Sequence, residues 1–170
     1  PLAIERKPEK LPEYALNIRQ LTHGATAQMR LILLELYPDA LAQTDLNAIL
    51  RHLCVAHTGD TGIAVTYTGS SQVQFAPHIQ MAFYRIAQEA LHNTRKHSNA
   101  SQINVSLVWE KSCVELTIED NGAGFDLQST AGGHFGLRNM QQRAEEVGAT
   151  LNIVSQVSQG TKIRVMKETA

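Results

Sequence analysis

The chain has 170 residues, of which 43% are hydrophobic and 18% are charged. This length and composition are typical of one globular domain with a short appendage. No apolar run approaches the roughly 20 residues that a membrane-spanning helix needs, and a net charge of −1 provides no excess of basic residues for binding nucleic acid. The sequence therefore argues against a membrane segment in this chain and against a nucleic-acid partner.

The cysteines and the first residue indicate the setting of the protein. Cys54 and Cys113 lie in apolar surroundings without a C-x-x-C spacing, which predicts two reduced core side chains and a cytoplasmic location. No stretch resembles a signal or transit peptide. Because the chain begins at Pro1 without an initiator Met and enters helical sequence directly, we expect it to be a piece of a larger protein.

The first predicted element is a long amphipathic helix over Leu11 to Tyr37, ended by Pro38. Its apolar residues recur at gaps of three and four: Tyr14, Ile18, Leu21, Ala25, Met29, Ile32 and Leu36. A single apolar stripe on so long a helix needs a partner surface, as in a helical hairpin or a dimeric bundle. A second helix is predicted over about Thr44 to His57, with Thr44 as its N-cap and glycines 59 and 62 closing it.

The remaining chain alternates strand and helix patterns. The predicted elements are a strand over 62–68, a helix opened by Pro77, a hairpin over 101–109 and 113–119, a glycine-rich loop over 120–134, a helix over 135–147 and a closing strand pair over 150–156 and 161–166. This order predicts an α/β (α+β) two-layer sandwich, in which helices cover one face of a mixed, mostly antiparallel sheet.

The helix opened by Pro77 carries the first chemical signal. Glu89, Asn93 and Lys96 follow one another at intervals of four and three, which places them on one helix face, and His97 comes next. The opposite face is apolar: Ile79, Phe83, Ile86, Ala87, Ala90 and Leu91. A carboxylate, an amide and an ammonium in a row can hold a metal–phosphate group. They can equally solvate the outer face of a surface helix.

Three glycine-rich segments follow at spacings that fit a ligand pocket. DNGAGFD, over 120–126, ends a strand with Asp120, and Gly122 and Gly124 allow a ligand to approach the backbone. GGHFGLRNM, over 132–140, places glycines before a helix N-terminus, where backbone N–H groups can face a phosphate. SQGT, over 158–161, is a glycine turn into the last strand. Each segment alone is also typical of a turn without a ligand, but their order and spacing are jointly specific.

Together these segments resemble the N, G1, G2 and G3 boxes of the ATP-binding domain of sensor histidine kinases, which share a superfamily with gyrase, mismatch-repair and heat-shock ATPases. RIAQEALHNTRKH, DNGAGFD and FGLRNMQQRAEEVGATLNI resemble in particular the nitrate-sensor-like subfamily, whose response regulators carry LuxR-type DNA-binding domains. The resemblance covers about Leu21 to Val165 and implies the same two-layer sandwich.

The resemblance assigns roles residue by residue. It implies that Glu89 and Asn93 hold or act through Mg²⁺, that Lys96 and His97 contact the phosphates of ATP, and that Asp120 binds the adenine amine. It also implies supporting positions: Gly122 and Gly124 in the adenine pocket, Gly133, Gly136 and Leu137 in the lid over the triphosphate, and Thr161 near the adenine.

Two departures from the family pattern concern the turn and the phospho-acceptor. The turn S-x-P-G-x-G-T of the family reads Ser155 to Thr161 here without its Pro and first Gly, so we expect a longer or less rigid turn. The R-x-L-H-D/E acceptor motif is missing, and His23 is not followed by an acidic residue. By the resemblance, residues 1–38 are the second helix of the dimerisation hairpin, residues 39–170 are the ATP-binding domain, and the acceptor histidine lies outside the chain.

The sequence therefore predicts the catalytic, ATP-binding portion of a two-component histidine kinase, with ATP and Mg²⁺ as its ligands. The implied partners are the hairpin of the same kinase in a homodimer and the receiver domain of a response regulator. The implied location is cytoplasmic, including the cytoplasmic end of a membrane-anchored sensor. Two alternatives remain at this point: a serine kinase of the anti-sigma type, against which the long first helix argues, and a non-catalytic nucleotide-binding regulatory module.

Overall fold

The computed structural model describes residues 10–36, 45–69, 75–110, 112–127 and 135–168, with several side chains of the first helix left out. The elements are α2 (Leu11–Leu36), α4 (Leu46–Thr61), β1 (Ala64–Gly69), α5 (Pro77–Asn93), a π-helical turn η2 (Thr94–Ser98), β2 (Gln102–Glu110), β3 (Cys113–Asp120), α6 (Phe135–Glu146), β4 (Thr150–Ser155) and β5 (Thr161–Glu168). This order confirms the predicted sequence of helices and strands.

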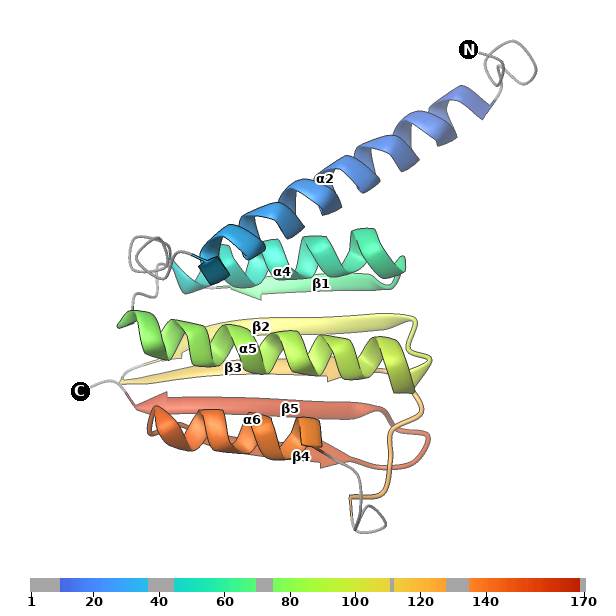
Figure 1. The fold of residues 1–170 in the computed structure, drawn as a ribbon. Coiled ribbons are helices and arrows are strands. Elements are labelled where there is room, and N and C mark those ends of the chain that lie inside the picture. Colours follow the sequence, from blue (N-terminus) through green and yellow to red (C-terminus); the bar gives the residue numbers. More distant parts are fainter. Residues whose placement is uncertain (1–9, 37–44, 70–74, 111, 128–134, 169–170) are drawn as a thin grey trace.

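A five-stranded sheet in the order β1-β2-β3-β5-β4 forms one layer of the fold (Figure 1). The pair β1–β2 is parallel and the other three pairs are antiparallel. The parallel pair requires a crossover, which α5 supplies. Helices α5 and α6 lie across the same face of the sheet in Figure 1, which confirms the predicted two-layer sandwich.

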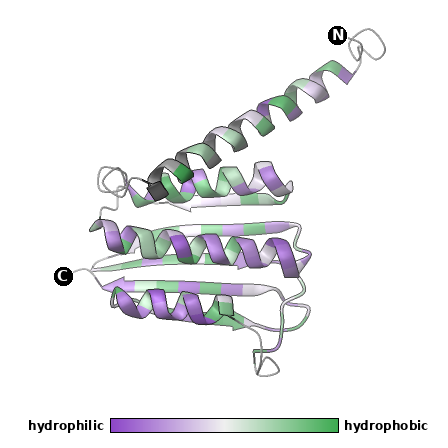
Figure 2. Cartoon of the chain, viewed as in Figure 1, coloured by the Kyte–Doolittle hydropathy of each residue, from purple (hydrophilic) through white to green (hydrophobic). Residues whose placement is uncertain are grey.

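The core lies between the sheet and its helices. Alternate residues of β2 and β3 are buried, as the period of two in a strand requires. Phe83, Ile86, Ala87, Ala90 and Leu91 of α5 are buried against them, so the predicted apolar face of this helix is confirmed, with Ile79 half-buried at its margin. Figure 2 shows mainly hydrophilic residues on the visible side of α5 and α6.

Helix α2 confirms the predicted long first helix and packs against α4. Its predicted end at Tyr37 and Pro38 lies outside the described residues. Three residues of the predicted apolar stripe, Ile18, Leu21 and Met29, are each more than 60% exposed. These three side chains are therefore largely uncovered by the rest of the chain. Among the described residues, no helix is both long enough and apolar enough to cross a membrane.

Helix α4 corrects two details of the prediction. Its N-cap is Asp45, whose side chain accepts a hydrogen bond from the backbone N–H of Asn47 at 3.2 Å, whereas the predicted cap Thr44 lies outside the described residues. The helix also passes through Gly59 and ends only at Thr61. Gly62 caps it with φ 74°, a left-handed conformation that glycine adopts without a Cβ clash.

Helix α5 begins at Pro77 as predicted but does not remain α-helical through Lys96. The α-helix ends at Asn93, and the next five residues, Thr94 to Ser98, form the π-helical turn η2. A π-turn carries more residues per turn than an α-helix, so it changes the directions in which the following side chains point. The interval of three between Asn93 and Lys96 therefore does not describe a single α-helical face, which corrects that part of the prediction.

Candidate functional site

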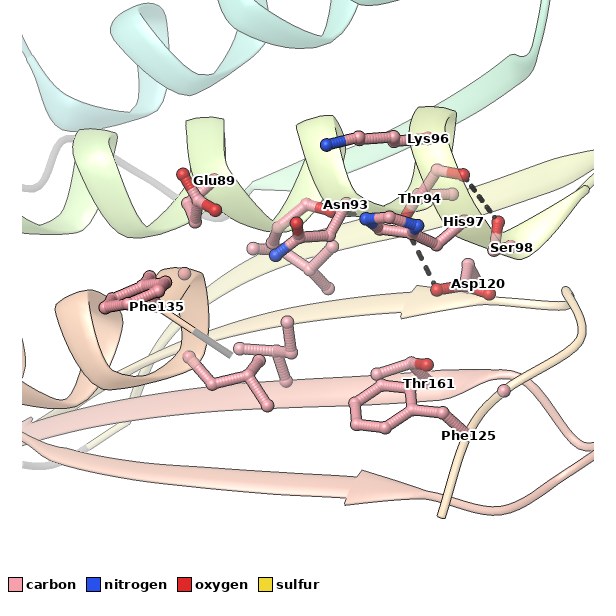
Figure 3. Close-up of a pocket in the computed structure, with 16 residues that line it drawn as sticks. Glu89, Asn93, Thr94, Lys96, His97, Ser98, Asp120, Phe125, Phe135 and Thr161 are labelled. Carbon is pink, nitrogen blue, oxygen red and sulfur yellow. Dashed lines mark hydrogen bonds between the residues drawn. The ribbon is translucent and has the colours of Figure 1, made fainter. Parts of the chain in front are cut away.

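A pocket of about 480 Å³ lies between α5–η2 and α6, above the adjoining ends of β3 and β5. We call it the Asp120 pocket. Nine of the residues predicted from the sequence line it: Glu89, Asn93, Lys96, His97, Asp120, Gly124, Gly136, Leu137 and Thr161. Segments that are far apart in the sequence therefore meet at one site (Figure 3).

The helical wall of the pocket carries the polar row. Figure 3 shows Glu89, Asn93 and Lys96 along α5 and η2. The first turn of α6 approaches this row so closely that a Cβ on Gly136 would collide with the Glu89 carboxylate and would lie 3.4 Å from Nδ2 of Asn93. A side chain at position 136 would therefore displace the Glu89 carboxylate from its present place beside α6.

The sheet supplies the floor of the pocket through the pairing of β3 with β5. Asp120 lies opposite Thr161, and two residues further along each strand Ile118 lies opposite Ile163. Because side chains alternate across a strand, these four residues point to the same face. The floor is therefore apolar at Ile118 and Ile163 and polar at its end, where Asp120 is only 7% exposed.

Asp120 is held by two hydrogen bonds inside the protein. The backbone N–H of Gly122 donates to Oδ1 at 2.9 Å, and the hydroxyl of Thr94 reaches Oδ2 at 3.2 Å. A buried carboxylate needs such donors, because an unsatisfied charged group in the interior is strongly unfavourable. Two fixed donors orient the carboxylate and leave its other lone pairs available to a ligand.

The loop after β3 is fastened to η2 and to the β4–β5 turn. The backbone N–H of Ala123 donates to the carbonyl oxygen of Ser98 at 2.6 Å, and the N–H of Ser158 donates to the carbonyl of Ala123 at 2.6 Å. Gly124 has φ 57°, and a Cβ there would meet the carbonyl oxygen of Gln156. The predicted glycine at 124 is thus required by both conformation and space.

The β4–β5 turn departs from the family pattern but has its own restraints. Ser158 adopts φ 65° and Gly160 φ 77°. The hydroxyl of Ser155 accepts the N–H of Phe125 at 2.9 Å and lies 3.1 Å from the carbonyl oxygen of Gly160, to which it donates. Side-chain hydrogen bonds therefore connect this turn to the loop after β3 despite the missing Pro and Gly.

Two predicted residues do not line the described pocket. Gly122 lies behind it, where its N–H serves Asp120 and a Cβ would collide with Ser98. Gly133 lies outside the described residues. Conversely, the pocket contains seven residues that the sequence analysis did not select: Ala90, Thr94, Ser98, Ile118, Phe125, Phe135 and Ile163. Of these, Ile118 and Ile163 follow the strand period beside Asp120 and Thr161, a signal that was present in the sequence.

The side chains present also fit a magnesium ion bound together with phosphates. Among the described residues, no group of three or more His, Cys, Asp or Glu side chains could hold a metal by itself. Glu89 and Asn93 lie one helical turn apart beside a pocket open to a ligand and offer one carboxylate and one amide. This donor set suits Mg²⁺, which completes its octahedron with water and phosphate oxygens rather than with a protein cage.

The fold and the pocket thus define a sandwich-type nucleotide-binding protein, and comparison with known proteins gives its family. The chain belongs to the family of histidine kinase-, DNA gyrase B- and HSP90-like ATPases, whose family model matches residues 78–169. The matched segment begins in the first turn of α5 and includes every described residue of the Asp120 pocket. Members of this family use ATP, as the resemblance predicts for this chain.

The relatives of this chain include a sensor protein and a histidine-protein kinase/phosphatase. The chain is 32% identical over 148 residues to the sensor protein VraS of Staphylococcus epidermidis, covering 87% of this chain and 42% of VraS. It is likewise 32% identical over 148 residues to the signal transduction histidine-protein kinase/phosphatase DegS of Brevibacillus brevis, covering 86% of this chain and 38% of DegS. The chain thus spans about two fifths of the length of these relatives.

Solved structures show the same fold. The ATP-binding domain of PrrB from Mycobacterium tuberculosis superposes with a TM-score of 0.62 at 20% identity, over 75% of this chain and 96% of that domain. At this identity the likeness concerns the fold alone. Fold and family together confirm the predicted histidine kinase-type ATP-binding domain.

Proposed function

We propose that this chain is the ATP-binding catalytic part of a two-component sensor histidine kinase, which transfers the γ-phosphoryl group of ATP to a histidine outside the chain for relay to an aspartate of a response regulator. The observation that carries the proposal is the Asp120 pocket itself. It combines a buried, oriented carboxylate at one end with the polar row of Glu89, Asn93 and Lys96 at the other.

The two ends of the pocket suit the two ends of ATP. The apolar floor of Ile118 and Ile163 suits the faces of an adenine ring, and Asp120 accepts a hydrogen bond from its exocyclic amine. Thr161, opposite Asp120 in the sheet, completes this end. Gly124 lets the loop after β3 pack against the β4–β5 turn at this end, because a Cβ there would meet the carbonyl oxygens of Gln156 and Gly160.

The phosphates would then reach the polar row and the start of α6. Lys96 and His97 offer positive charge or N–H donors to phosphate oxygens. Gly136 and Leu137 in the first turn of α6 bring backbone N–H groups and the positive end of the helix dipole to the same region, and Gly133 would extend this lid.

Asn93 and Glu89 would bind the magnesium ion, which supplies neutralisation of phosphate charge during transfer. Asn93 would offer its amide oxygen to the ion. Glu89 would orient a water or accept a proton at its carboxylate oxygen. Because phosphoryl transfer depends mainly on position and charge, the work of these side chains is to hold the reacting groups in line and to exclude competing water.

The division into two parts follows from the exposed stripe of α2. We propose that residues 1–38 are the second helix of a dimerisation hairpin and that residues 39–170 are the ATP-binding domain. Ile18, Leu21 and Met29 are largely exposed, and a helix with such a stripe is stabilised by a partner helix. The first hairpin helix, with the acceptor histidine, and a second copy would cover it.

The proposed partners follow from the same family pattern. The receiver domain of a response regulator, of the type joined to a LuxR-type DNA-binding domain, would accept the phosphoryl group, as the nitrate-sensor-like motifs suggest. A cytoplasmic position of this part of the kinase is consistent with ATP as its substrate.

Transfer of label from γ-labelled ATP to a separately prepared hairpin of the same kinase tests the proposal. We expect Mg²⁺-dependent labelling of the hairpin that is labile in acid and stable in base, as phosphohistidine is. Acid-stable label on a protein serine would instead support a kinase of the anti-sigma type. ATP binding without transfer to any acceptor would support a regulatory module.

A further inference from the structure

The inference concerns Thr94, the first residue of the π-turn, and it rests on the proposed function of the pocket. Thr94 is 4% exposed and belongs to the few buried polar residues among those described, with Gln80, Ser98 and Asp120. The predicted roles leave this hydroxyl without an assignment. We propose that Thr94 is a positioning residue that sets the preference of the pocket for a base with an exocyclic amine, by orienting the Asp120 carboxylate.

The hydrogen bonds of Thr94 favour this role. Its hydroxyl lies 3.1 Å from the carbonyl oxygen of Ala90 and 3.2 Å from Oδ2 of Asp120, and it has one proton to donate. The Ala90 carbonyl already accepts the backbone N–H of Thr94. A carboxylate is also the stronger acceptor. The hydroxyl proton is therefore directed to Asp120, in the hydrogen bond that a dashed line marks in Figure 3.

The two donors to Asp120 come from opposite sides of the carboxylate. Gly122 serves Oδ1 from the loop after β3, and Thr94 serves Oδ2 from η2. With one donor on each oxygen, rotation of the carboxylate would break a hydrogen bond. A fixed, buried acceptor discriminates strongly between ligands that do and do not bring a donor, because the wrong ligand leaves it incompletely paired.

The surrounding turn holds the hydroxyl in place. The hydroxyl of Ser98 donates to the carbonyl oxygen of Thr94 at 2.8 Å and accepts the N–H of Ala100 at 3.1 Å. The carbonyl oxygen of Ser98 in turn accepts the N–H of Ala123. The π-turn thus connects the Thr94 hydroxyl to the same loop that supplies the other donor. Thr117 of β3 offers a matched control, because it lies outside the pocket, on the opposite face of the strand from Asp120, and its hydroxyl donates to Oε1 of Glu115 at 3.0 Å.

The test measures the affinity of the 170-residue chain for two ligands that differ only in the 6-amino group, ADP and purine riboside 5′-diphosphate. The unsubstituted chain should bind ADP more tightly. Thr94→Val, which keeps the shape and removes the hydroxyl, should lower the ADP preference by about tenfold. Thr94→Ser should restore it. Thr117→Val, the same substitution outside the pocket, should leave the ratio of the two affinities unchanged.

The outcomes separate this inference from the proposed function. If Thr94→Val weakens the binding of both ligands equally, Thr94 has a packing role only. The same follows if Thr94→Ser behaves like Thr94→Val. Either result overturns the inference, while ADP binding by the unsubstituted chain upholds the pocket. Absence of ADP binding to the unsubstituted chain overturns the proposed function and the inference together.

Discussion

Two hollows of similar size differ in whether the polar groups of their walls are available to a ligand. The Asp120 pocket measures about 480 Å³, and a second hollow of about 420 Å³ lies between α2, α4 and β1, where Arg19, Arg51, Cys54 and Tyr67 contribute to its walls. We call the second hollow the α4 groove. Only the first contains a buried carboxylate with fixed donors on both oxygens.

The α4 groove instead disfavours charge on its buried groups. Burial raises the pKa of the Cys54 thiol to about 12 and raises the pKa of Tyr67 above its ordinary value. The Tyr67 hydroxyl donates to the side-chain oxygen of Asn47 at 2.7 Å, and the Arg51 guanidinium lies 5.4 Å from the Tyr67 ring centre. The Tyr67 hydroxyl thus has its acceptor within the protein, whereas the Asp120 pocket keeps an acceptor available. The difference indicates which hollow binds a polar ligand.

The largest expected effect contrasts one glycine from each region. Gly160, in the turn at the Asp120 pocket, and Gly62, at the end of α4, both adopt a positive φ. A Cβ at 160 would collide with the carbonyl oxygen of Asp120, whereas a Cβ at 62 would meet nothing within 4 Å. Gly62→Ala should therefore cost about 1–2 kcal/mol of stability from the left-handed conformation alone.

Gly160→Ala should cost clearly more, about 3 kcal/mol or above, because backbone must move. Urea unfolding of the two variants measures the difference. Equal losses would contradict the tight contact between the turn and the end of β3.

A smaller effect is expected at Tyr67. Tyr67→Phe removes the hydroxyl that donates to Asn47 and should lower the free energy of unfolding by about 1 kcal/mol. The affinity of this variant for ADP should stay within about twofold of the unsubstituted chain. Neither Tyr67 nor its partner Asn47 lines the Asp120 pocket, and substitutions at sites without shared partners act independently. Thermal unfolding and an ADP titration check the two parts. A large loss of affinity would mean that the α4 groove and the Asp120 pocket are coupled, which would weaken the comparison.

The effect confined to alkaline pH is the titration of Cys54. Its thiol is more stable in the protonated form when folded, with a pKa of about 12 against an ordinary value of 9.0. The contribution of the protonated, buried thiol to the stability of the folded state is complete below pH 9 and is lost as the pH rises toward 12. Cys54→Ala should flatten this part of the stability profile, measured by urea unfolding at several pH values. The same slope in both proteins would contradict the burial of the thiol as its cause.

The sequence predicted those features that depend on local pattern. Pro77 at the start of α5, the alternation in β2 and β3 and the glycine at 124 each follow from a neighbouring residue or a short period. The start of α4 was misplaced because Thr44 and Asp45 are both good caps, and its end because a glycine such as Gly59 is tolerated inside a packed helix.

The site was predictable in composition but not in its internal contacts. The sequence spacing indicated Glu89, Asn93 and Asp120 as one site, but the register that places Asp120 opposite Thr161 depends on non-local strand pairing. The π-turn was missed because its sequence continues a helical pattern, and only tertiary contact with the loop after β3 distinguishes it. The role of Thr94 depends on that turn, so it could not be inferred from spacing.

The most direct test of the account is calorimetric titration of this chain and of Asp120→Asn with a non-hydrolysable ATP analogue, with and without Mg²⁺. The account predicts binding that Mg²⁺ strengthens and that Asp120→Asn weakens by about a hundredfold, because the amide offers only one acceptor oxygen and brings a donor toward the adenine amine. Equal binding by both proteins, or no binding by the unsubstituted chain, would contradict the assignment of the Asp120 pocket to ATP.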